Sequence, residues 1–216
     1  MTIKKRGRPT SGAQLSTKHI IESAKTLMQE MGKVPSLRQL ATNLNVDAMA
    51  IYHYFKNKDA MLEALAVSLI SDIYEPNGDA PWQTELLRLA HSYIELLLHY
   101  PGLLQTLLSM NTTSPALVFI ERFDLVVAPL QLDAQQQKDS LDLFVDYLHG
   151  FALAMNCQQS LNAKSQQAKV NEKIRPENTQ AEKHQQKATQ QQQTELQIAA
   201  INGPLSRYIT LLEHSH

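Results

Sequence analysis

The sequence has little of what secreted, membrane-spanning or zinc-binding proteins need. Its 216 residues include one cysteine, Cys157, which excludes an internal disulfide and cannot by itself form a zinc site. Apolar helical residues precede Cys157, so we expect an inert buried thiol, with a redox sensor as the alternative. The apolar runs, such as 96–98, fall far short of the roughly 20 residues that cross a bilayer. No apolar segment follows the basic N-terminal residues, and we expect a cytoplasmic protein.

Motifs typical of enzymes are also missing. The chain has only seven glycines, no phosphate-binding glycine loop and no Gly-x-Ser-x-Gly sequence. None of its eight histidines forms a His-x-x-x-His pair with a nearby carboxylate at metal-ligand spacing. We therefore expect no catalysis, no cofactor and no bound metal.

Charge is distributed unevenly along the chain, although the formal net charge is only −1. Residues 1–60 carry ten Lys and Arg against four Asp and Glu, whereas residues 61–216 carry ten against seventeen. A basic unit thus precedes an acidic body, as expected if only the first part faces a polyanion. We expect a DNA-binding domain over 1–60 and a regulatory domain over 61–216.

Apolar residues recur at helical spacing, and no stretch shows the two-residue alternation and turn residues of a sheet. The sequence therefore predicts an all-α protein. Capping residues, glycines and prolines predict helices near 17–31, 36–44, 47–54, 58–72, 81–100, 102–110, 114–127, 134–161 and 194–212. Breaker residues at 74–80 mark a candidate domain boundary, and Gly203 with Pro204 predicts a jog in the last helix.

Composition changes sharply between residues 158 and 193. This segment is rich in Gln, Lys, Asn and Glu and has almost no large apolar side chain. Too little apolar surface is present to offset the entropy lost on ordering, so we expect a long mobile loop with at most transient helix. A prion-like or coactivator-binding role is the alternative for this segment.

Two short helices joined by a tight turn are expected over residues 36–54. The residues that fall on the inner face of this unit are all apolar: Leu37, Leu40, Ala41, Val46, Ile51 and Phe55. The residues left facing outward are Arg38, Asp47, Ala48, Met49, Ala50, Tyr52 and His53. Met and Tyr are poor choices for a face that only meets water, whereas a helix-turn-helix places its second helix in the major groove of DNA. The pattern therefore predicts a helix-turn-helix.

Residues 16–66 resemble the DNA-binding module of the TetR family. In that family a small residue and an Arg enter the second helix, and a Tyr-x-x-Phe-x-x-Lys run leaves the third; here the run is Tyr52, Phe55 and Lys58. The resemblance implies a three-helix DNA-binding domain joined by a fourth helix to a C-terminal helical ligand-binding and dimerisation domain. It also implies a transcriptional repressor that binds a palindromic operator in double-stranded DNA as a homodimer. A small, largely apolar effector would release it, and control by a protein partner is the alternative.

The same resemblance assigns roles to residues of the module. It implies that Ser36 caps its helix and can bind a phosphate, that Arg38 contacts a base or a phosphate, and that Lys58 binds a phosphate at a helix N-terminus. Base-facing or phosphate-facing positions around the third helix are Asp47, Ala48, Met49, Ala50, Tyr52 and His53. Ala-Met-Ala offers no side-chain hydrogen bonds, so we expect contacts to thymine methyl groups and half-sites that favour A/T.

A basic arm precedes the first expected helix. Arg6 and Arg8, with two lysines, would suit an adjacent minor groove or the phosphates, and a solvated tail is the alternative. In the C-terminal domain the resemblance implies an effector cavity, with Tyr74 at the end of the fourth helix contacting the ligand and that helix as the lever. Taken singly, each candidate fits a core position better than a cavity wall, and only the group indicates a cavity: Tyr74, Trp82, Leu89, Tyr93, Leu107, Met110, Phe119, Phe123 and Phe144.

Leu89 and Leu107 fall near where the polar groups of a tetracycline site would be expected, so tetracycline is not the expected inducer. The helices expected over 134–161 and 194–212 would form an intersubunit four-helix bundle, as the resemblance implies. The small residues that would let the helices of the two subunits approach closely are Gly150, Ala154, Ala199 and Ala200. The larger residues that would supply buried area are Tyr147, Phe151, Leu205, Tyr208 and Leu212.

Overall fold

The computed structural model describes residues 15–172, 192, 195–196 and 198–214, with side-chain detail absent for 159–172. These residues are helical or lie in turns and loops, and none forms a strand. The predicted all-α class is confirmed. In this described part no single helix has the length and apolar composition needed to span a membrane. One pair of helices has that length and composition when taken together, Leu103–Ser109 with Ser114–Leu130, but the pair is bent by 104°.

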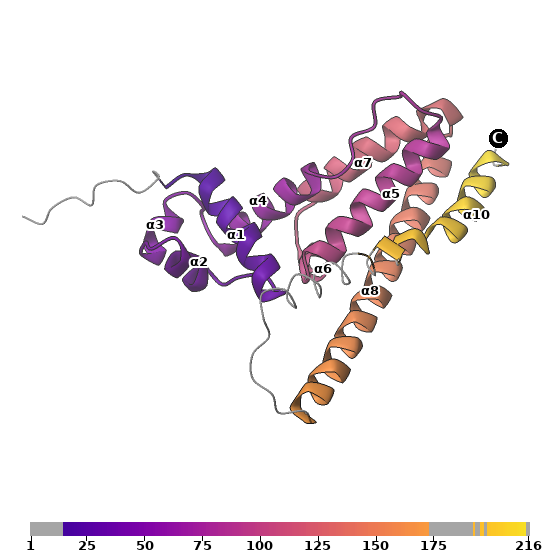
Figure 1. Cartoon of the computed structure of the whole chain (residues 1–216). Helices are drawn as coiled ribbons and strands as arrows, with labels where there is room; N and C mark the ends of the chain where they lie inside the picture. Colours follow the sequence, from indigo (N-terminus) through magenta and orange to yellow (C-terminus); the bar gives the residue numbers. More distant parts are fainter. Residues whose placement is uncertain (1–14, 173–191, 193–194, 197, 215–216) are drawn as a thin grey trace, which may run out of the picture.

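The N-terminal module comprises α1 (Thr17–Met31), α2 (Leu37–Asn43) and α3 (Ala48–Tyr52), gathered at one end of the molecule in Figure 1. Local chemistry sets these boundaries. The hydroxyl of Ser16 accepts a hydrogen bond from the backbone amide of His19 at the start of α1, and Gly32 ends that helix with a φ of 64°. Glycine adopts this left-handed conformation without the steric cost that a Cβ would impose.

Helix α4 (Lys58–Ser71) leads from this module into the rest of the molecule, where it packs most extensively against α7 (Ser114–Val127) (Figure 1). Beyond α4 follow α5 (Trp82–His99), α6 (Leu103–Ser109), α7, a short 3-10 turn η1 (Ala128–Leu130), α8 (Ala134–Glu172) and α10 (Asn202–Glu213). Because α4 spans both parts, a shift of this helix would move the N-terminal module relative to the C-terminal body.

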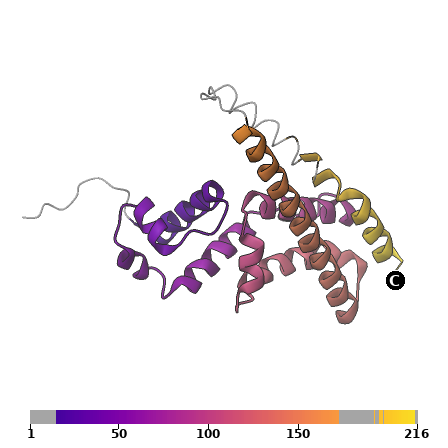
Figure 2. The ribbon, with the colours of Figure 1, turned by 90° about the horizontal axis from the view of Figure 1, so that it is seen from below.

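Helices α5 and α10 run antiparallel. Gln83 near the start of α5 donates to the Glu213 carboxylate at the end of α10, at 2.8 Å. One end of α10 is thus fixed, and the other is fixed by His91, whose Nε2 lies 2.6 Å from Asn202 Oδ1. Helix α10 also lies beside the N-terminal part of α8 in both views (Figures 1 and 2), and the Tyr208 hydroxyl donates to the Ser140 carbonyl at 2.7 Å.

The buried apolar side chains form one continuous cluster from α1 to α10. Aromatic rings cross its C-terminal part in a row. Tyr93 of α5 lies 4.6 Å from Phe119 of α7, and Phe144 of α8 lies 5.5 Å from Phe123 and 5.4 Å from Tyr208, measured between ring centroids. These separations are those of favourable aromatic pairs, so the row ties four helices together.

The prediction of a mobile loop over 158–193 is wrong for its first part. Helix α8 continues through this segment to Glu172, and its C-terminal portion extends past the other helices in Figure 1. Gln, Lys and Ala have high helix propensity, and neither Gly nor Pro interrupts residues 151–172. Continuation of an existing helix also avoids the cost of nucleation, which the compositional reasoning ignored. Residues 173–191 lie outside the described part of the chain.

Two smaller predictions also need correction. The break before the last helix lies at Ala200–Ile201, and Pro204 lies in the first turn of α10, where its missing amide costs no intrahelical hydrogen bond. Cys157 is exposed on α8 rather than buried. It follows apolar residues in the sequence, but it lies on the face of α8 turned away from the core.

Candidate nucleic-acid interface and ligand cavity

Helix α2 is fixed at its start by a reciprocal capping interaction. The Ser36 amide donates to Gln39 Oε1 at 2.9 Å, and the Gln39 amide donates to Ser36 Oγ at 3.3 Å. Such a capping box satisfies two backbone donors that would otherwise lack partners. Arg38 is the second residue of α2, and its side chain is exposed to solvent.

The following helix, α3, presents a small exposed tip. The Asp47 carboxylate caps it by accepting from the Met49 amide at 2.7 Å, while the fully buried Ile51 anchors it to the core. Met49 is 65% exposed, and Tyr52 and His53 are exposed beside it. Two predicted base-facing residues are less available, because Ala48 and Ala50 are half-buried, with Ala48 packed against the core. Met49 therefore supplies most of the apolar tip.

Ser36 and Lys58 line one cavity of about 410 Å³ between the N-terminal module and α6, together with Lys33, Gln39 and Thr106. Lys58 is the first residue of α4, whose N-cap Asn57 accepts from the Ala60 amide at 2.7 Å. A hydroxyl, two ammonium groups and a helix N-terminus are the groups that bind phosphate in proteins. Arg6 and Arg8 lie outside the described residues.

A second cavity of about 400 Å³ lies among α4 to α8. It is lined by Ile70, Tyr93, Leu107, Leu108, Met110, Thr112, Pro115, Ala116, Phe119, Ile120, Leu141, Asp142, Val145, Asp146 and His149. A mostly apolar wall with a few polar groups is typical of small-molecule sites. The structure thus brings four of the predicted cavity residues together: Tyr93, Leu107, Met110 and Phe119.

Five predicted cavity residues lie elsewhere. Leu89, Phe123 and Phe144 are fully buried in the core, where helical spacing alone could not distinguish them from a cavity wall. Trp82 is half-buried against the core at the start of α5.

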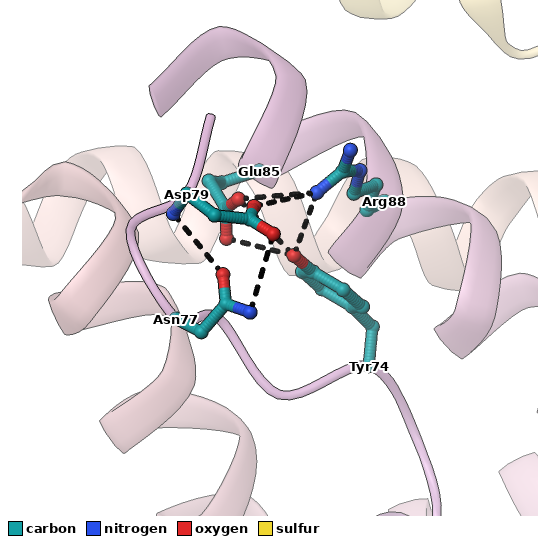
Figure 3. A network of polar contacts seen from close by, with 5 residues as sticks. All are labelled: Tyr74, Asn77, Asp79, Glu85 and Arg88. Carbon is teal, nitrogen blue, oxygen red and sulfur yellow. Dashed lines mark hydrogen bonds and ion pairs between the residues drawn. The ribbon is translucent and has the colours of Figure 1, made fainter. Parts of the chain in front are cut away.

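Tyr74 belongs to a polar network on the loop between α4 and α5, shown in Figure 3. Its hydroxyl lies 3.0 Å from the carboxylate of Glu85, which is only 3% exposed, and it accepts from Arg88 at 3.1 Å. Arg88 also donates to Asp79 at 3.0 Å, and the guanidinium lies 5.7 Å from the centre of the Tyr74 ring. Tyr74 therefore holds the loop against α5 and does not line the cavity.

The cavity has one neutral polar pair. The Tyr93 hydroxyl lies 2.8 Å from His149 Nε2. Burial raises the pKa of Tyr93 well above its usual range. Burial lowers the pKa of His149, and the charge of Asp146 opposes this only in part. Both groups are therefore neutral at pH 7 and can exchange hydrogen bonds with a ligand.

Helix α4 is fastened to α7 at two points. Near its middle, Glu63 Oε1 accepts hydrogen bonds from Ser114 Oγ at 2.5 Å and from Thr112 Oγ1 at 2.8 Å. These bonds lower the pKa of Glu63. Thr112 also lines the cavity, so a ligand there would contact a group that holds α4.

The second point is the C-terminus of α4. The buried guanidinium of Arg122, on α7, donates to the carbonyls of Ile73 and Ser71 at 2.8 Å and of Ile70 at 3.1 Å. Carbonyls at a helix C-terminus lack the usual amide four residues on, although the Ile70 carbonyl also accepts from the Ile73 amide at 3.3 Å, and a cation there complements the helix dipole. The Asp72 carboxylate, in turn, accepts from Lys25 of α1 at 2.7 Å.

Sequence reasoning missed Glu63, Thr112, Arg122 and His149. Arg122 could have been recognised, because it is a charged residue within the mostly apolar α7 and a buried charge requires a partner. The other three gave no signal, since their roles depend on contacts between separate helices.

The predicted dimer residues fall into two groups. Leu205 and Leu212 are buried within the chain and therefore do not supply an exposed surface as expected, whereas Tyr208 is half-buried against Phe144. The remaining predicted residues are exposed or half-buried on α8 and before α10: Tyr147, Gly150, Phe151, Ala154, Ala199 and Ala200.

Comparison with known proteins agrees with this architecture. Residues 20–65 match the model of bacterial regulatory proteins of the tetR family, and residues 75–205, more than half of the chain, match the tetracyclin repressor-like C-terminal domain. The chain is 35% identical over 92 residues to tetracycline repressor protein class A from transposon 1721 of Escherichia coli, and 34% identical over 93 residues to the class D repressor of Escherichia coli. These matches cover 40% and 41% of this chain and 42% of each relative.

Solved structures show the same fold. The chain is similar to ActR from Streptomyces coelicolor in complex with actinorhodin, with a TM-score of 0.67, 16% identity and coverage of 93% of this chain and 96% of that one. It is similar to TetR from Acinetobacter baumannii AYE, with a TM-score of 0.59, 22% identity and coverage of 93% and 97%. BioQ with its double-stranded DNA operator gives a TM-score of 0.59, 16% identity and coverage of 73% and 95%. The chain therefore belongs to the tetR family of bacterial regulatory proteins, a family of DNA-binding transcription regulators.

Proposed function

We propose that the chain is a ligand-responsive repressor that binds a palindromic operator as a homodimer and is released by a small, largely apolar effector. The observation that carries this proposal is the position of α4. This helix begins at Lys58, which shares a cavity with Ser36, the second candidate for phosphate contact, and it is held further along by Thr112 of the other cavity's wall. One helix thus connects the two sites that such a regulator needs.

DNA binding is supported by the exposed side chains around α2 and α3. Arg38 is the candidate for a guanine or phosphate contact, Met49 for contact with thymine methyl groups, and Tyr52 and His53 for phosphate contacts. So short a recognition helix makes few base contacts, and useful affinity requires two modules on a two-fold-related site. The predicted basic arm with Arg6 and Arg8 would add phosphate contacts.

A dimer surface is supported by a stripe on the exposed side of α8. Leu143, Tyr147, Gly150 and Ala154 follow one another at spacings of four, three and four residues, and Leu143 is 65% exposed. This spacing keeps one face of a helix toward a partner helix. The α8 helices of two copies would pair along it, leaving both N-terminal modules free to bind half-sites.

Control by a ligand is favoured over control by a protein partner because a cavity with a mainly apolar wall is present. Similar structures have been determined with actinorhodin, with minocycline and with a DNA operator. These complexes support a small molecule and operator DNA as the two partners of this chain. The division into a DNA-binding domain over 1–60 and a regulatory domain over 61–216 is part of this proposal.

Selection of binding sites from a random DNA pool tests the proposal. The full chain is expected to enrich two-fold symmetric sites with A/T-leaning half-sites. Arg38→Ala should weaken binding of the selected site by about 1–3 kcal/mol, whereas Lys138→Ala, an exposed change on α8, should leave it unaltered. No enrichment, or equal losses in the two variants, would contradict DNA recognition through α2 and α3.

A further inference from the structure

The charged side chains of the cavity are all of one sign. Asp142 and Asp146 line it from neighbouring turns of α8, and no Lys or Arg is among its lining residues. The carboxylate of Glu63 lies directly behind Thr112 of the wall. A ligand in this cavity would therefore lie near three carboxylates, two of them in its wall.

Little in the surroundings neutralises this charge. Asp142 pairs with Lys138, but both side chains are more than half exposed, and such surface pairs are weak and easily exchanged. Asp146 makes no hydrogen bond or ion pair within the described part of the chain. His149, the one group of the wall that could become a cation, is held neutral by burial.

Aromatic rings provide the second recognition element. Tyr93 and Phe119 line the same cavity with their ring centroids 4.6 Å apart. The faces of such rings attract cations, particularly where water is excluded. Leu107, Met110 and Val145 supply the apolar surface around them.

We propose that the effector is an amphipathic cation, with an apolar or aromatic body in contact with Tyr93 and Phe119 and a positive charge beside Asp146 and Asp142. This deepens the proposed function, on which it rests, by naming the chemical class of the effector. A neutral or anionic compound of equal size would lose the attraction of the carboxylates while keeping the apolar contacts.

A matched pair of ions tests the charge preference. Tetraphenylphosphonium and tetraphenylborate have nearly the same size and shape but opposite charge. Calorimetric titration of the full chain is expected to give about tenfold tighter binding of the phosphonium at low salt. This preference should shrink as added salt screens the carboxylates of Asp142 and Asp146. Equal binding of the two ions, tighter binding of the borate, or no binding of the phosphonium would overturn the proposal.

Variants locate the effect. In the double variant Asp142→Asn, Asp146→Asn the preference for the phosphonium should largely disappear, whereas Asp139→Asn, an exposed change on the same helix outside the cavity, should retain it. Loss of the preference in Asp139→Asn as well would mean that the general surface charge is responsible and would overturn the proposal.

The outcomes also separate this proposal from the proposed function. Release of DNA by neutral compounds as readily as by the phosphonium would overturn the proposed effector class and leave a ligand-responsive regulator. Tight, carboxylate-dependent binding of the phosphonium by a chain that enriches no DNA would support the cation site and overturn the regulator.

Discussion

The hydroxyl of Ser114, at the first residue of α7, donates a 2.5 Å hydrogen bond to the carboxylate of Glu63 on α4. Thr112, two residues earlier, donates to the same oxygen and also lines the ligand cavity. A ligand that draws the Thr112 side chain toward itself would weaken this attachment. Because α4 continues to Lys58 beside the N-terminal module, the attachment joins the cavity wall to the helix that leads to that module, alongside Ile70 of α4, which lines the cavity itself.

Replacement of Glu63 by Gln should reveal this attachment as a pH-dependent contribution to stability. The hydrogen bonds lower the pKa of Glu63 from its ordinary value near 4.5, so the unfolded chain binds the proton more readily than the folded one. The stabilisation by the ionised Glu63 is therefore fully present above the ordinary pKa. It is lost as the pH falls through the lower pKa that Glu63 has in the folded chain. Melting temperatures should show Glu63→Gln less stable than the wild type at neutral pH, with the difference disappearing in acid. Glu95→Gln, an exposed change on α5, is the control, and a pH-independent difference would contradict this role.

Arg122 should be the most costly single charged residue to remove from α7. Arg122→Met keeps most of the side-chain volume but removes the Arg122 donor from the carbonyls of Ser71 and Ile73, while the Ile70 carbonyl keeps the Ile73 amide. Hydrogen bonds to charged groups contribute about 1.5–3 kcal/mol each, and we expect a net loss of about 2–4 kcal/mol in the free energy of unfolding. Urea denaturation measures this loss, and Glu121→Ala, an exposed neighbour, should change stability by less than about 0.5 kcal/mol. A similarly small effect of Arg122→Met would show that the cap is not needed.

His149 should make stability fall on mild acidification. Burial lowers its pKa below the ordinary value of 6.5, so protonation favours the unfolded chain. The neutral form therefore stabilises the fold above about pH 6.5, and this contribution is lost as the pH falls toward the folded pKa. His149→Gln, which keeps a polar partner for Tyr93, should show a smaller drop in melting temperature between about pH 7.5 and about pH 5.5. The exposed His99→Gln should behave as the wild type, and an unchanged drop in His149→Gln would rule out this source of pH dependence.

A charge in the stripe on α8 should separate the two copies of the proposed dimer. Ala154→Arg places a guanidinium between apolar helices that would otherwise pack closely, and burial of an unpaired charge is strongly unfavourable. Sedimentation analysis should show a monomer where the wild type is a dimer, and operator affinity should fall with it. Glu95→Arg, on the exposed side of α5, should remain dimeric. A dimeric Ala154→Arg would mean that the interface lies elsewhere.

Local sequence signals located most helices correctly because they act over a few residues. Ser16, Ser36 and Asp47 cap the helices that follow them and Gly32 ends α1, as expected, whereas Asn57, which was expected to close the third helix, caps α4. The same reasoning failed for the end of α8, where residues without a buried face continue an existing helix to Glu172. Low apolar content limits packing, but it does not stop a helix that has already formed.

The cavity could be predicted only in part. Tyr93 and Phe144 both lie at helical spacing on apolar faces, yet only Tyr93 lines the cavity, because the choice depends on how α5, α7 and α8 pack. Tyr74 was expected to contact the ligand at the end of α4, but its hydroxyl bonds with Glu85 and Arg88 direct it to the loop. Such contacts join residues 11 or more positions apart in the sequence, and the helical spacing of apolar residues gives no information about them.

The connection between the cavity and the N-terminal module is tested most directly by measuring both affinities in one experiment. A DNA duplex from the selection is bound by the full chain and titrated with a compound that fills the cavity. Ala116→Trp, which would fill the cavity itself, serves as the control. Ligand is expected to weaken DNA binding, and DNA to weaken ligand binding, by the same factor, on the order of 5–150-fold. A ligand that saturates the cavity of the DNA complex while both affinities stay unchanged would contradict this connection.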